Sequence, residues 1–599
     1  MQGTIVNLCV GVGDIVTPGD PIVVLEAMKM EHIVSADRAG RISALHVKAG
    51  DIVASGAAIG FLARDETLSA KTRADATIDL DLVRPDLAEI GALHALGLDA
   101  NRPEAIARRR KSGRRTAREN IADLCDEGAF VEYGALAVAA QRTRRSLDDL
   151  RRSTPADGLV AGIGGVNGAL FGADAAQCAI MAYDFTVLAG TQGFLNHKKK
   201  DRVLHLARDW RLPTIIFTEG GGGRPGDTDI LAPTWLEMTT FRDYAALSGV
   251  VPRIAINAGY SFAGNAALVG LSDVVIATED SSIGMGGPAM IEGGGLGVVA
   301  PNEVGPTASQ ASAGVVDLVV KDETDGVDAA KKYLAYFQGA LSHWDCADQR
   351  MLRHLIPENR MRVYDVRNII DTMADAGSVL ELRRAFGRGM VTALIRIEGR
   401  PFGLIANDPA YLAGAIDADG ADKAARFLQL CDAFNLPVVS LCDTPGFMVG
   451  PAAEKTGLVR KVSRLFLIGA QMRTPMFTIV LRKGYGLGAQ GMTGGHFHAP
   501  AFTVAWPTAE FGTMGLEGSV RLGFKKELEA VSDGDARRAL FQDLVAQAYE
   551  KGKAANAAAF LEIDAVIDPR DTRHWLSRGW QATRRGAPAA SSPRFVDSW

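Results

Sequence analysis

Lys29 stands between two methionines in the segment E-A-M-K-M, residues 26–30, and its setting suggests a chemical use. A hairpin turn that holds one lysine clear of a small domain lets that side chain carry a reactive group on a long arm. Met28 and Met30 would give soft apolar support beside it. The alternative is a solvated surface lysine, the usual state of an exposed Lys.

Glycine-rich segments follow apolar runs at two distant places, E-G-G-G-G-R at 219–224 and R-K-G-Y-G-L-G-A-Q-G-M at 482–492. A glycine-rich turn directly after a buried strand exposes backbone N–H groups at the strand end. Fixed donors of this kind stabilise negative charge that develops on an oxygen. One cluster alone would favour a tight turn without chemistry, but two clusters in related surroundings favour a pair of oxyanion holes.

Cationic residues gather in the run A-R-R-R-K-S-G-R-R-T-A-R at 107–118 and in N-H-K-K-K at 196–200. Arginine offers paired donors to phosphate oxygens, so both segments are candidates for binding a phosphorylated ligand. For any single arginine, a solvated helix face is an equally good interpretation, and His197 could be only a surface residue. His496 and His498 lack a third ligand at a supporting spacing, and we predict no metal site.

The elements around Lys29 are short β-strands, with turn signals such as P-G-D and K-A-G-D between them. The phrase v-x-x-G-D-x-V occurs at 10–16 and again at 47–53, which predicts a small flattened all-β barrel of two related halves. The expected strands are Thr4–Val6, Ile22–Leu25, Ile33–Ser35, Arg41–Leu45 and Ile59–Leu62.

Beyond residue 105 the sequence repeats itself. L-P-T-I-I-F-T-E-G-G-G-G-R (212–224) parallels L-P-V-V-S-L-C-D-T-P-G-F (436–447), and two later landmarks keep nearly the same spacing, so that the offsets are 224, 225 and 228 residues. Each copy alternates helix, apolar strand and glycine-rich turn. This pattern predicts two tandem α/β domains of one fold.

The composition is that of an ordinary globular chain, with 599 residues, 47% hydrophobic, 23% charged and a net charge of −5. The charge disfavours a nucleic-acid or membrane-surface binder. No long uncharged apolar stretch and no secretory signal are present, so no membrane span is expected. Six scattered cysteines indicate reduced thiols and a cytoplasmic location.

E-A-M-K-M resembles the biotinylation signature of biotinyl carrier domains, and Lys29 matches the modified lysine. A lipoyl domain, the nearest alternative, would usually have D-K-A in place of M-K-M. The family generally has another strand before M-Q-G-T-I-V, paired near Ile59–Leu62. We therefore expect an open edge there, and either a shortened domain or an internal position for Met1.

Residues 105–585 resemble the carboxyltransferase component of the acyl-CoA carboxylases, of the acetyl-, propionyl- and methylcrotonyl-CoA types. E-G-G-G-G-R matches the family's E-S-G-G-A-R, and R-K-G-Y-G-L-G-A-Q-G-M matches R-K-A-Y-G-G-A-Y-D-x-M. D-T-P-G-F (443–447) and R-R-T-A-R-E-N-I (114–121) match further motifs. The resemblance implies two crotonase-like α/β domains.

The resemblance also assigns residues to functions. It places N–H donors for the acyl-CoA thioester at Gly221 and Gly222, and donors for biotin at Leu487 and Gly488. Gln490 stands where the family has Asp or a small apolar residue that shapes the acyl pocket. The candidate CoA-binding residues are Arg114, Arg115, Arg118 and Lys198.

The implied reaction transfers a carboxyl group from carboxybiotin on Lys29 to the α-carbon of an acyl-CoA. The alternatives are a transcarboxylase or an acyl-CoA decarboxylase component with the same site, and a non-catalytic biotin-carrying scaffold. The chain has no ATP-grasp region, so a biotin carboxylase on another polypeptide or in missing upstream sequence would load the carrier. A biotin-protein ligase would modify Lys29, and a homodimer or trimer of dimers is implied.

The expected domains are a biotinyl domain at 1–66, a linker at 67–104, and carboxyltransferase domains at 105–340 and 341–590. The linker is charged and Ala-rich, with one short helix expected at 83–98. Part of it should act as a mobile tether, because a carrier must travel between two active sites.

Overall fold

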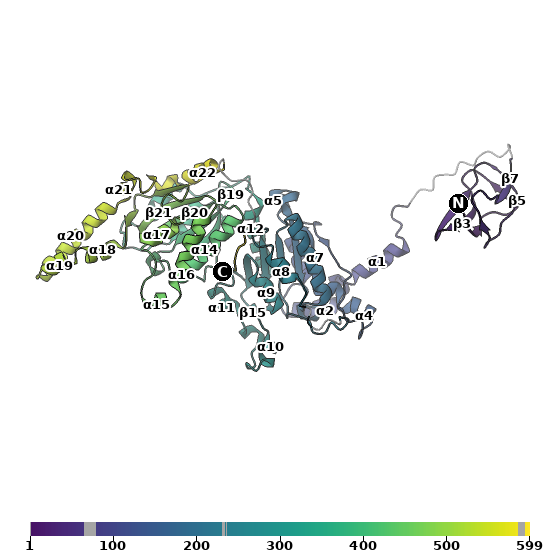
Figure 1. Ribbon diagram of the computed structural model, residues 1–599, viewed down its shortest axis with the longest axis horizontal. Helices are drawn as coiled ribbons and strands as arrows, with labels where there is room; N and C mark the ends of the chain where they lie inside the picture. The colour runs from purple at the N-terminus through teal and green to yellow at the C-terminus, as the bar shows by residue number, and fades with distance from the viewer. Residues whose placement is uncertain (1, 65–78, 231–233, 235, 585–593, 599) are drawn as a thin grey trace. The chain divides into compact units, whose positions relative to one another are not determined.

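The computed structural model describes residues 2–64, 79–230, 234, 236–584 and 594–598. The chain divides into two compact units, Met1–Ala88 and Glu89–Trp599. The predicted tether falls largely on residues 65–78, which lie outside the described residues. The expected linker helix is present as α1, Pro85–Ala95 (Figure 1).

The N-terminal unit consists of two small sheets with strand orders β4-β3-β1-β6 and β2-β5-β7. Alternate side chains of the strands point inward and form two small apolar clusters, around Val23 and Ile42. The strands are β1 Gly3–Leu8, β2 Ile15–Val16, β3 Pro21–Ala27, β4 Met30–Ser35, β5 Gly40–Leu45, β6 Ile52–Val53 and β7 Gly60–Arg64.

All five predicted strands of this unit overlap observed ones, and the repeated v-x-x-G-D-x-V phrase has a structural counterpart. Each copy ends in a two-residue strand directly after G-D, β2 in the first copy and β6 in the second. Within residues 2–64, β7 pairs with β5 alone. The expected open edge near Ile59–Leu62 is therefore present.

The first half of the larger unit has a seven-stranded sheet of order β16-β14-β12-β11-β10-β9-β8. β10 runs antiparallel to β9 but parallel to β11, and the strands beyond β11 continue parallel. The strands are β8 Val131–Glu132, β9 Leu159–Gly165, β10 Gln177–Tyr183, β11 Thr214–Phe217, β12 Arg253–Asn257, β14 Val274–Thr278 and β16 Leu318–Val320, with a separate pair β13 Tyr260–Phe262 and β15 Ser282–Gly284.

The second half repeats this topology, with the order β17-β18-β19-β20-β21-β22-β24 and β23 paired to the end of β21. β19 runs antiparallel to β18 and parallel to β20, as β10 does to its own neighbours. The duplication predicted from the sequence is thus a duplicated fold. The strands are β17 Leu380–Leu382, β18 Met390–Ile397, β19 Arg400–Asn407, β20 Val438–Thr444, β21 Met476–Tyr485, β22 Phe502–Ala505, β23 Glu510–Gly512 and β24 Ala565–Val566.

Helices cover both sheets, and one apolar cluster joins the two halves (Figure 1). Tyr333 of α12 and Leu428 of α14 both belong to this cluster and are fully buried. The main helices are α2 Pro103–Lys111, α3 Ala117–Leu124, α7 Phe194–Trp210, α8 Thr240–Ala245, α9 Gly264–Gly270, α10 Pro288–Gly293, α12 Glu323–Gln338, α13 Val366–Met373, α14 Ala418–Ala433, α16 Leu458–Gln471, α17 Gly486–Met492 and α22 Thr572–Thr583.

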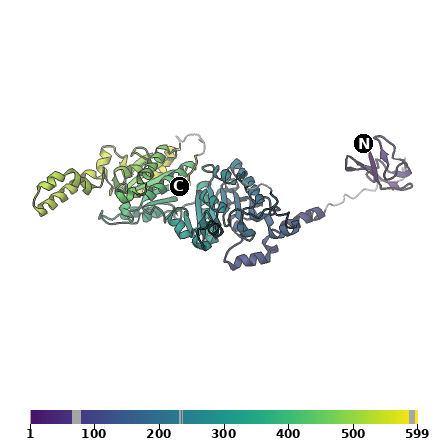
Figure 2. The ribbon, with the colours of Figure 1, turned by 60° about the horizontal axis from the view of Figure 1, so that its bottom comes forward.

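Three helices extend away from the second half as an arm, α18 Leu516–Gly523, α19 Lys525–Ala530 and α20 Gly534–Gly552 (Figures 1 and 2). Of the nineteen residues of α20, only Val545 is buried. Helix α21, Ala554–Ala559, returns the chain to the sheet. In the part of the chain that the structure describes, no helix is long and apolar enough to cross a membrane.

Candidate active site

Lys29, the predicted carrier lysine, lies at the tip of the hairpin between β3 and β4. Ala27 pairs with Met30 across the two strands, so Met28 and Lys29 alone form the turn. Both have positive φ, 54° and 65°, as the tightest hairpin turns require. Lys29 is exposed and Met28 is 98% exposed, so a ligase can reach the lysine from solvent. This geometry fits a covalently attached biotin.

Corresponding loops lie at the carboxyl ends of the parallel strands in the two halves. Gln192 forms an isolated bridge with Gly223 after β11, and Ile416 forms the same bridge with Phe447 after β20. Both residues of the second bridge lie 224 positions after those of the first. The two loops therefore correspond at an offset of 224 residues.

Each half also has a Leu-Ala-Gly turn beside this loop, at 188–190 and at 412–414. All six residues of the two turns have positive φ, between 47° and 86°. Leucine and alanine rarely adopt this conformation, and such strain persists only where the surrounding structure holds it. The tripeptide repeat was visible in the sequence, but its importance appears only from the backbone geometry.

In the first half, both predicted donors already have acceptors inside the protein. The Gly221 N–H donates to the Ala189 carbonyl oxygen at 3.1 Å, and the Gly222 N–H donates to Asn265 Oδ1, also at 3.1 Å. A thioester oxygen would have to displace these acceptors. Within the described residues, the neighbouring Gly223 N–H has no hydrogen-bond acceptor.

In the second half, the predicted donors Leu487 and Gly488 belong to the first turn of α17, which begins directly after β21. The side chain of Leu487 is 63% exposed. A Cβ added to Gly488 would lie 2.6 Å from the Gly446 Cα, so the helix start packs closely against the loop after β20. Only glycine allows this approach.

The two predicted donor pairs do not occupy equivalent positions. Gly221 and Gly222 correspond to Pro445 and Gly446, which follow β20. The bridge of Gly220 with Ser261 corresponds to the pairing of Thr444 with Gly484. By this register, Leu487 and Gly488 correspond to Gly264 and Asn265, at the start of α9. The two pairs thus come from different loops of the repeated fold.

A cavity of about 500 Å³ opens beside the start of α17. Leu487 and Gln490 line it, together with residues of α20 and α21. Its apolar wall is aromatic, and polar side chains that include Lys551, Asn556 and Glu562 line the rest of it, a combination found in small-molecule sites. The side chains that form this aromatic wall are Phe497, Phe511 and Phe560.

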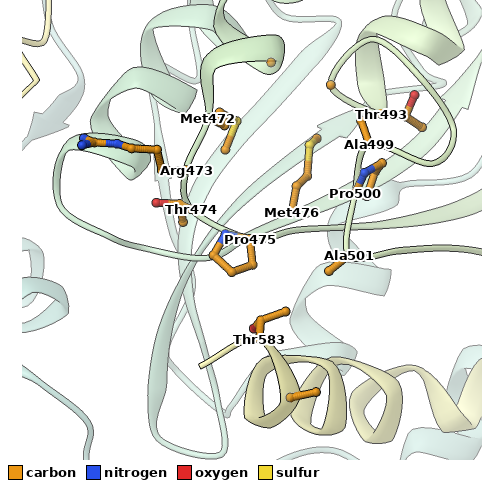
Figure 3. A pocket seen from close by; sticks show the side chains of 13 residues that line it. Met472, Arg473, Thr474, Pro475, Met476, Thr493, Ala499, Pro500, Ala501 and Thr583 are labelled. Carbon is orange, nitrogen blue, oxygen red and sulfur yellow. The ribbon is translucent and has the colours of Figure 1, made fainter. Parts of the chain in front are cut away.

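A second cavity of about 430 Å³ lies at the opposite edge of the same sheet (Figure 3). It surrounds Pro475 and Met476, where β21 begins, and reaches Thr583 at the end of α22. In folds of this kind, ligands bind at the carboxyl ends of parallel strands. The first cavity is therefore the better candidate for the active site.

The arginines predicted to bind CoA form ion pairs with carboxylates of the protein. Arg114 pairs with Asp280 at 2.7 Å, while Arg115 and Arg118 pair with Asp123 and Glu132, each at 2.8 Å. Arg109 pairs with Glu219, and Arg110 with Glu119. Among the described residues, no carboxylate lies within ion-pair distance of Arg108 or Lys111.

A cavity of about 800 Å³ nevertheless opens over this run, lined by Arg110, Arg114 and Arg115. Glu119 and Asp123 line the same cavity, so carboxylates and guanidinium groups share its surface. The run therefore has a structural use, because its ion pairs tie it to α3 and to the sheet. CoA binding by Arg114, Arg115 and Arg118 stays a prediction.

Only Lys198 of the N-H-K-K-K segment is exposed, and its ammonium lies 4.6 Å from the centre of the Phe194 ring. His197 is buried, so its interpretation as a surface residue is wrong. Its Nδ1 lies 2.8 Å from the Thr240 hydroxyl, and burial lowers its pKa to about 3, which keeps the ring neutral. Lys199 and Lys200 are also buried, because the helix turns their side of α7 toward the sheet.

His496 and His498 lie near each other, with ring centres 5.5 Å apart. The His498 ring contacts the Leu561 carbonyl oxygen through Nε2 at 2.9 Å. Among the described residues, no group of three His, Cys, Asp or Glu side chains could hold a metal ion.

The sequence interpretation did not identify three polar residues that support the two loops. Asn265 accepts from Gly222, as described above. Asp443 is fully buried at the end of β20, and Lys483 near the end of β21 donates from Nζ to the Ala413 carbonyl oxygen at 2.6 Å. The sequence interpretation used R-K-G-Y-G (482–486) for its glycines. The contact of Lys483 with Ala413 appears only in the folded structure.

Comparison with known families agrees with both units. Residues 1–62 match the family described as biotin-requiring enzyme, and residues 108–592 match the carboxyl transferase domain family. The second match covers more than half of the chain. The chain therefore belongs to the biotin-dependent carboxyltransferases. It is an enzyme that transfers a carboxyl group between biotin, held covalently, and an acyl-CoA.

Two curated relatives have similar lengths to the matched region. The methylmalonyl-CoA carboxyltransferase 12S subunit of Propionibacterium freudenreichii subsp. shermanii is 32% identical, over 80% of this chain and 91% of its own length. The propionyl-CoA carboxylase beta chain of Saccharopolyspora erythraea is 30% identical, over 84% of this chain and 93% of its own.

Two solved structures resemble the chain. A single-chain, multi-domain long-chain acyl-CoA carboxylase is 53% identical with a TM-score of 0.80, and the match covers 96% of this chain. This chain spans 55% of the length of that protein. A transcarboxylase 12S structure, described as a hexamer, is 29% identical over 87% of this chain and 100% of its own, with a TM-score of 0.74. The two halves are therefore crotonase-like, as predicted.

Proposed function

We propose that this chain is the carrier and carboxyltransferase part of a long-chain acyl-CoA carboxylase. The observation that carries the proposal is its 53% identity, across both units, to the single-chain long-chain acyl-CoA carboxylase. The 12S relative supports a transcarboxylase as the second candidate, but it matches a smaller share of this chain.

The cavity beside α17 supports a large acyl group. Its volume of about 500 Å³ and its wall of three phenylalanines exceed the needs of a propionyl group. Gln490 places a neutral amide at its edge, and Lys551 and Glu562 add one cationic and one anionic side chain to its lining. We assign the distal acyl chain to this cavity.

Biotin on Lys29 supplies the carboxyl group, and the protein supplies fixed N–H donors on either side of the reacting atoms. We propose Gly221, Gly222 and the neighbouring Gly223 as the donors for the acyl-CoA thioester, and Leu487 and Gly488 as those for biotin. Among the three glycines, Gly223 needs no acceptor to be displaced, whereas a thioester bound by Gly221 would release the Ala189 oxygen. Arg114, Arg115, Arg118 and Lys198 are the proposed CoA ligands, with Arg108 and Lys111 beside them.

The proposed organisation is a biotinyl domain at 1–66, a linker at 67–104, and carboxyltransferase domains at 105–340 and 341–590. The end of α12 at Gln338 supports the last boundary. The proposed partners are a biotin carboxylase, on another chain or in a longer form of this protein, a biotin-protein ligase, and further copies of this chain. Six free cysteines support a cytoplasmic location.

The test is a carboxylation assay across acyl chain lengths. The purified chain, biotinylated on Lys29, would be combined with a biotin carboxylase, ATP and labelled bicarbonate, and label would be followed into acetyl-, propionyl-, methylcrotonyl- and palmitoyl-CoA. We expect the highest kcat/KM with palmitoyl-CoA. A preference for propionyl-CoA would overturn the long-chain assignment, and no label in any thioester would overturn the carboxylase proposal.

A further inference from the structure

The two Leu-Ala-Gly turns are held in the same strained conformation by different groups. In the first half, the Gly221 N–H donates to the carbonyl oxygen of Ala189, the central residue of the turn. In the second half, the residue that corresponds to Gly221 is Pro445, which has no N–H. The same backbone donor is therefore not available to Ala413.

Lys483 supplies the missing donor. Its Nζ lies 2.6 Å from the Ala413 carbonyl oxygen, the counterpart of the Ala189 oxygen. Leu412 and Ala413 have φ of 47° and 53°. This turn is therefore as strained as the first one, and it too requires stabilising contacts from residues outside the turn. A charge-assisted hydrogen bond from an ammonium is at least as strong as the amide bond that it replaces.

Asp443 in turn holds Lys483. Its Oδ1 accepts the Lys483 backbone N–H at 3.1 Å and lies 3.4 Å from Nζ, while the Tyr364 hydroxyl donates to its Oδ2 at 2.7 Å. Arg482 Nε lies 3.2 Å from the same Oδ2. The carboxylate is fully buried, so the partly exposed Lys483 side chain has one rigid partner that holds it in place.

The turn held in this way lies beside the proposed donors of the second half. A Cβ on Gly414 would meet the Asp443 carbonyl oxygen at 2.2 Å, which places the turn against the end of β20. The next residues continue into the bridge of Ile416 with Phe447, and the loop of that bridge packs against Gly488. Movement of the turn would move the biotin side of the site.

We infer that Lys483 is a positioning residue, which fixes the 412–414 turn by replacing the backbone donor that the first half takes from Gly221. This inference rests on the proposed active site at these loops. Lys483 transfers no proton in it and contacts no substrate. Its contribution is to hold backbone groups within the narrow tolerance that catalysis requires.

The experiment is a set of variants, K483M, P445G and K483M/P445G, assayed as the full biotinylated chain with a biotin carboxylase. K483M removes the ammonium, and P445G restores a backbone N–H at the position of Gly221. We expect K483M to lower kcat about 10- to 100-fold, as a displacement of about 1 Å in a site does, with the acyl-CoA KM changed less than about 3-fold. P445G alone should stay within about 3-fold of wild type, and the double variant should regain most of the lost kcat.

Amide hydrogen exchange at residues 411–416 gives a readout that does not depend on activity. K483M should speed exchange in this segment, and the added P445G should slow it again. A K483M enzyme with wild-type kcat and exchange would overturn the inference, as would a folded double variant no better than K483M. If K483M does not fold, K483R, which keeps a donor, must fold and remain active, and its failure would also overturn it.

The outcomes separate this inference from the proposed function. If the wild-type chain carboxylates no acyl-CoA, the proposed function fails, whereas the exchange data still decide whether Lys483 holds the turn. If wild type is active and the variants behave identically to it, only the positioning inference fails.

Discussion

At the residue scale, Lys29 depends on a turn with no glycine in it. Both Met28 and Lys29 adopt positive φ, which non-glycine residues enter at a cost of order 1–3 kcal/mol each. Antiparallel pairing of β3 with β4 on either side holds the turn in place. This turn places the lysine side chain at the exposed tip of the hairpin.

Lys29→Arg should abolish biotin incorporation while leaving the domain folded. Arginine keeps the charge and the length of the side chain, but its guanidinium is not a nucleophile at neutral pH. Streptavidin binding after incubation with a biotin-protein ligase measures the modification. Lys48→Arg, on another exposed turn, is the matched control and should label normally. Equal labelling of K29R would show that another lysine is the carrier site.

At the element scale, α7 carries buried cations into the first half. Lys200 is fully buried, its ammonium contacts the Tyr183 hydroxyl, and burial lowers its pKa to about 7. A lysine with a lowered folded pKa destabilises the fold while it remains charged in the unfolded state. That cost is fully present below about pH 7 and disappears as the pH rises toward the usual lysine pKa of about 10.4.

Removal of this pair should therefore stabilise the protein in a pH-dependent way. In K200M/Y183F the ammonium and its hydroxyl partner leave together, so no buried polar atom is stranded. We expect a higher Tm than wild type at pH 7, with the difference shrinking by pH 10. Thermal melts at both values measure it. A Tm difference that grows with pH would contradict the lowered pKa of Lys200. The control is K198M, on the exposed face of α7, whose Tm difference from wild type should not depend on pH in this way.

Helix α21 ends next to Phe560, whose ring lines the proposed acyl cavity although it is 83% exposed. Phe560→Ala should lower kcat/KM for palmitoyl-CoA about 5- to 10-fold, because burial of a large side chain against a ligand contributes roughly 1–1.5 kcal/mol. The kcat/KM for propionyl-CoA should fall less than about 2-fold, because the short acyl group does not reach Phe560 and a substitution of an exposed side chain has a small effect by itself.

Leu561→Ala is the control for this variant, because Leu561 is a neighbouring exposed apolar residue that does not line the cavity. It should leave both substrates unchanged. If F560A loses the same activity with short and with long acyl chains, the assignment of the distal acyl chain to this cavity is wrong.

At the scale of the whole molecule, the two halves of the larger unit are joined by a short C-terminal segment as well as by a common core. Val596 is buried, and its N–H and carbonyl both bond to the Ser248 hydroxyl of the first half at 2.7 Å. On either side of it, Arg594 pairs with Asp432 and Asp597 pairs with Arg464, both in the second half. The segment thus contacts both halves at once.

Deletion of residues 594–599 should lower the Tm and reduce the cooperativity of unfolding, because it removes contacts that link the two halves. Calorimetry or circular dichroism melts would show a broadened or split transition. Phe595→Ser, which changes an exposed side chain of the same segment, should melt like wild type. A single, unshifted transition in the deletion would mean that the common core alone couples the halves.

The sequence by itself determined the features that depend on short stretches of chain. The predicted carrier lysine, the five strands around it and the duplication at an offset near 224 follow from local periodicity and contiguous motifs. The structure contains these features because a strand, a turn or a helix face is specified largely by its own residues. The glycine-rich segment 482–492, in contrast, forms the end of β21 and helix α17 and not a turn.

The tertiary structure alone decided which groups meet across long separations. Gly221 and Gly222 were predicted as free donors, yet their N–H groups are taken by Ala189 and by Asn265, 32 and 43 positions away. Lys483 meets the Ala413 oxygen 70 positions earlier, where Pro445 cannot donate. No local pattern encodes such pairings, because they arise only when packing brings separate strand ends to one edge of a sheet.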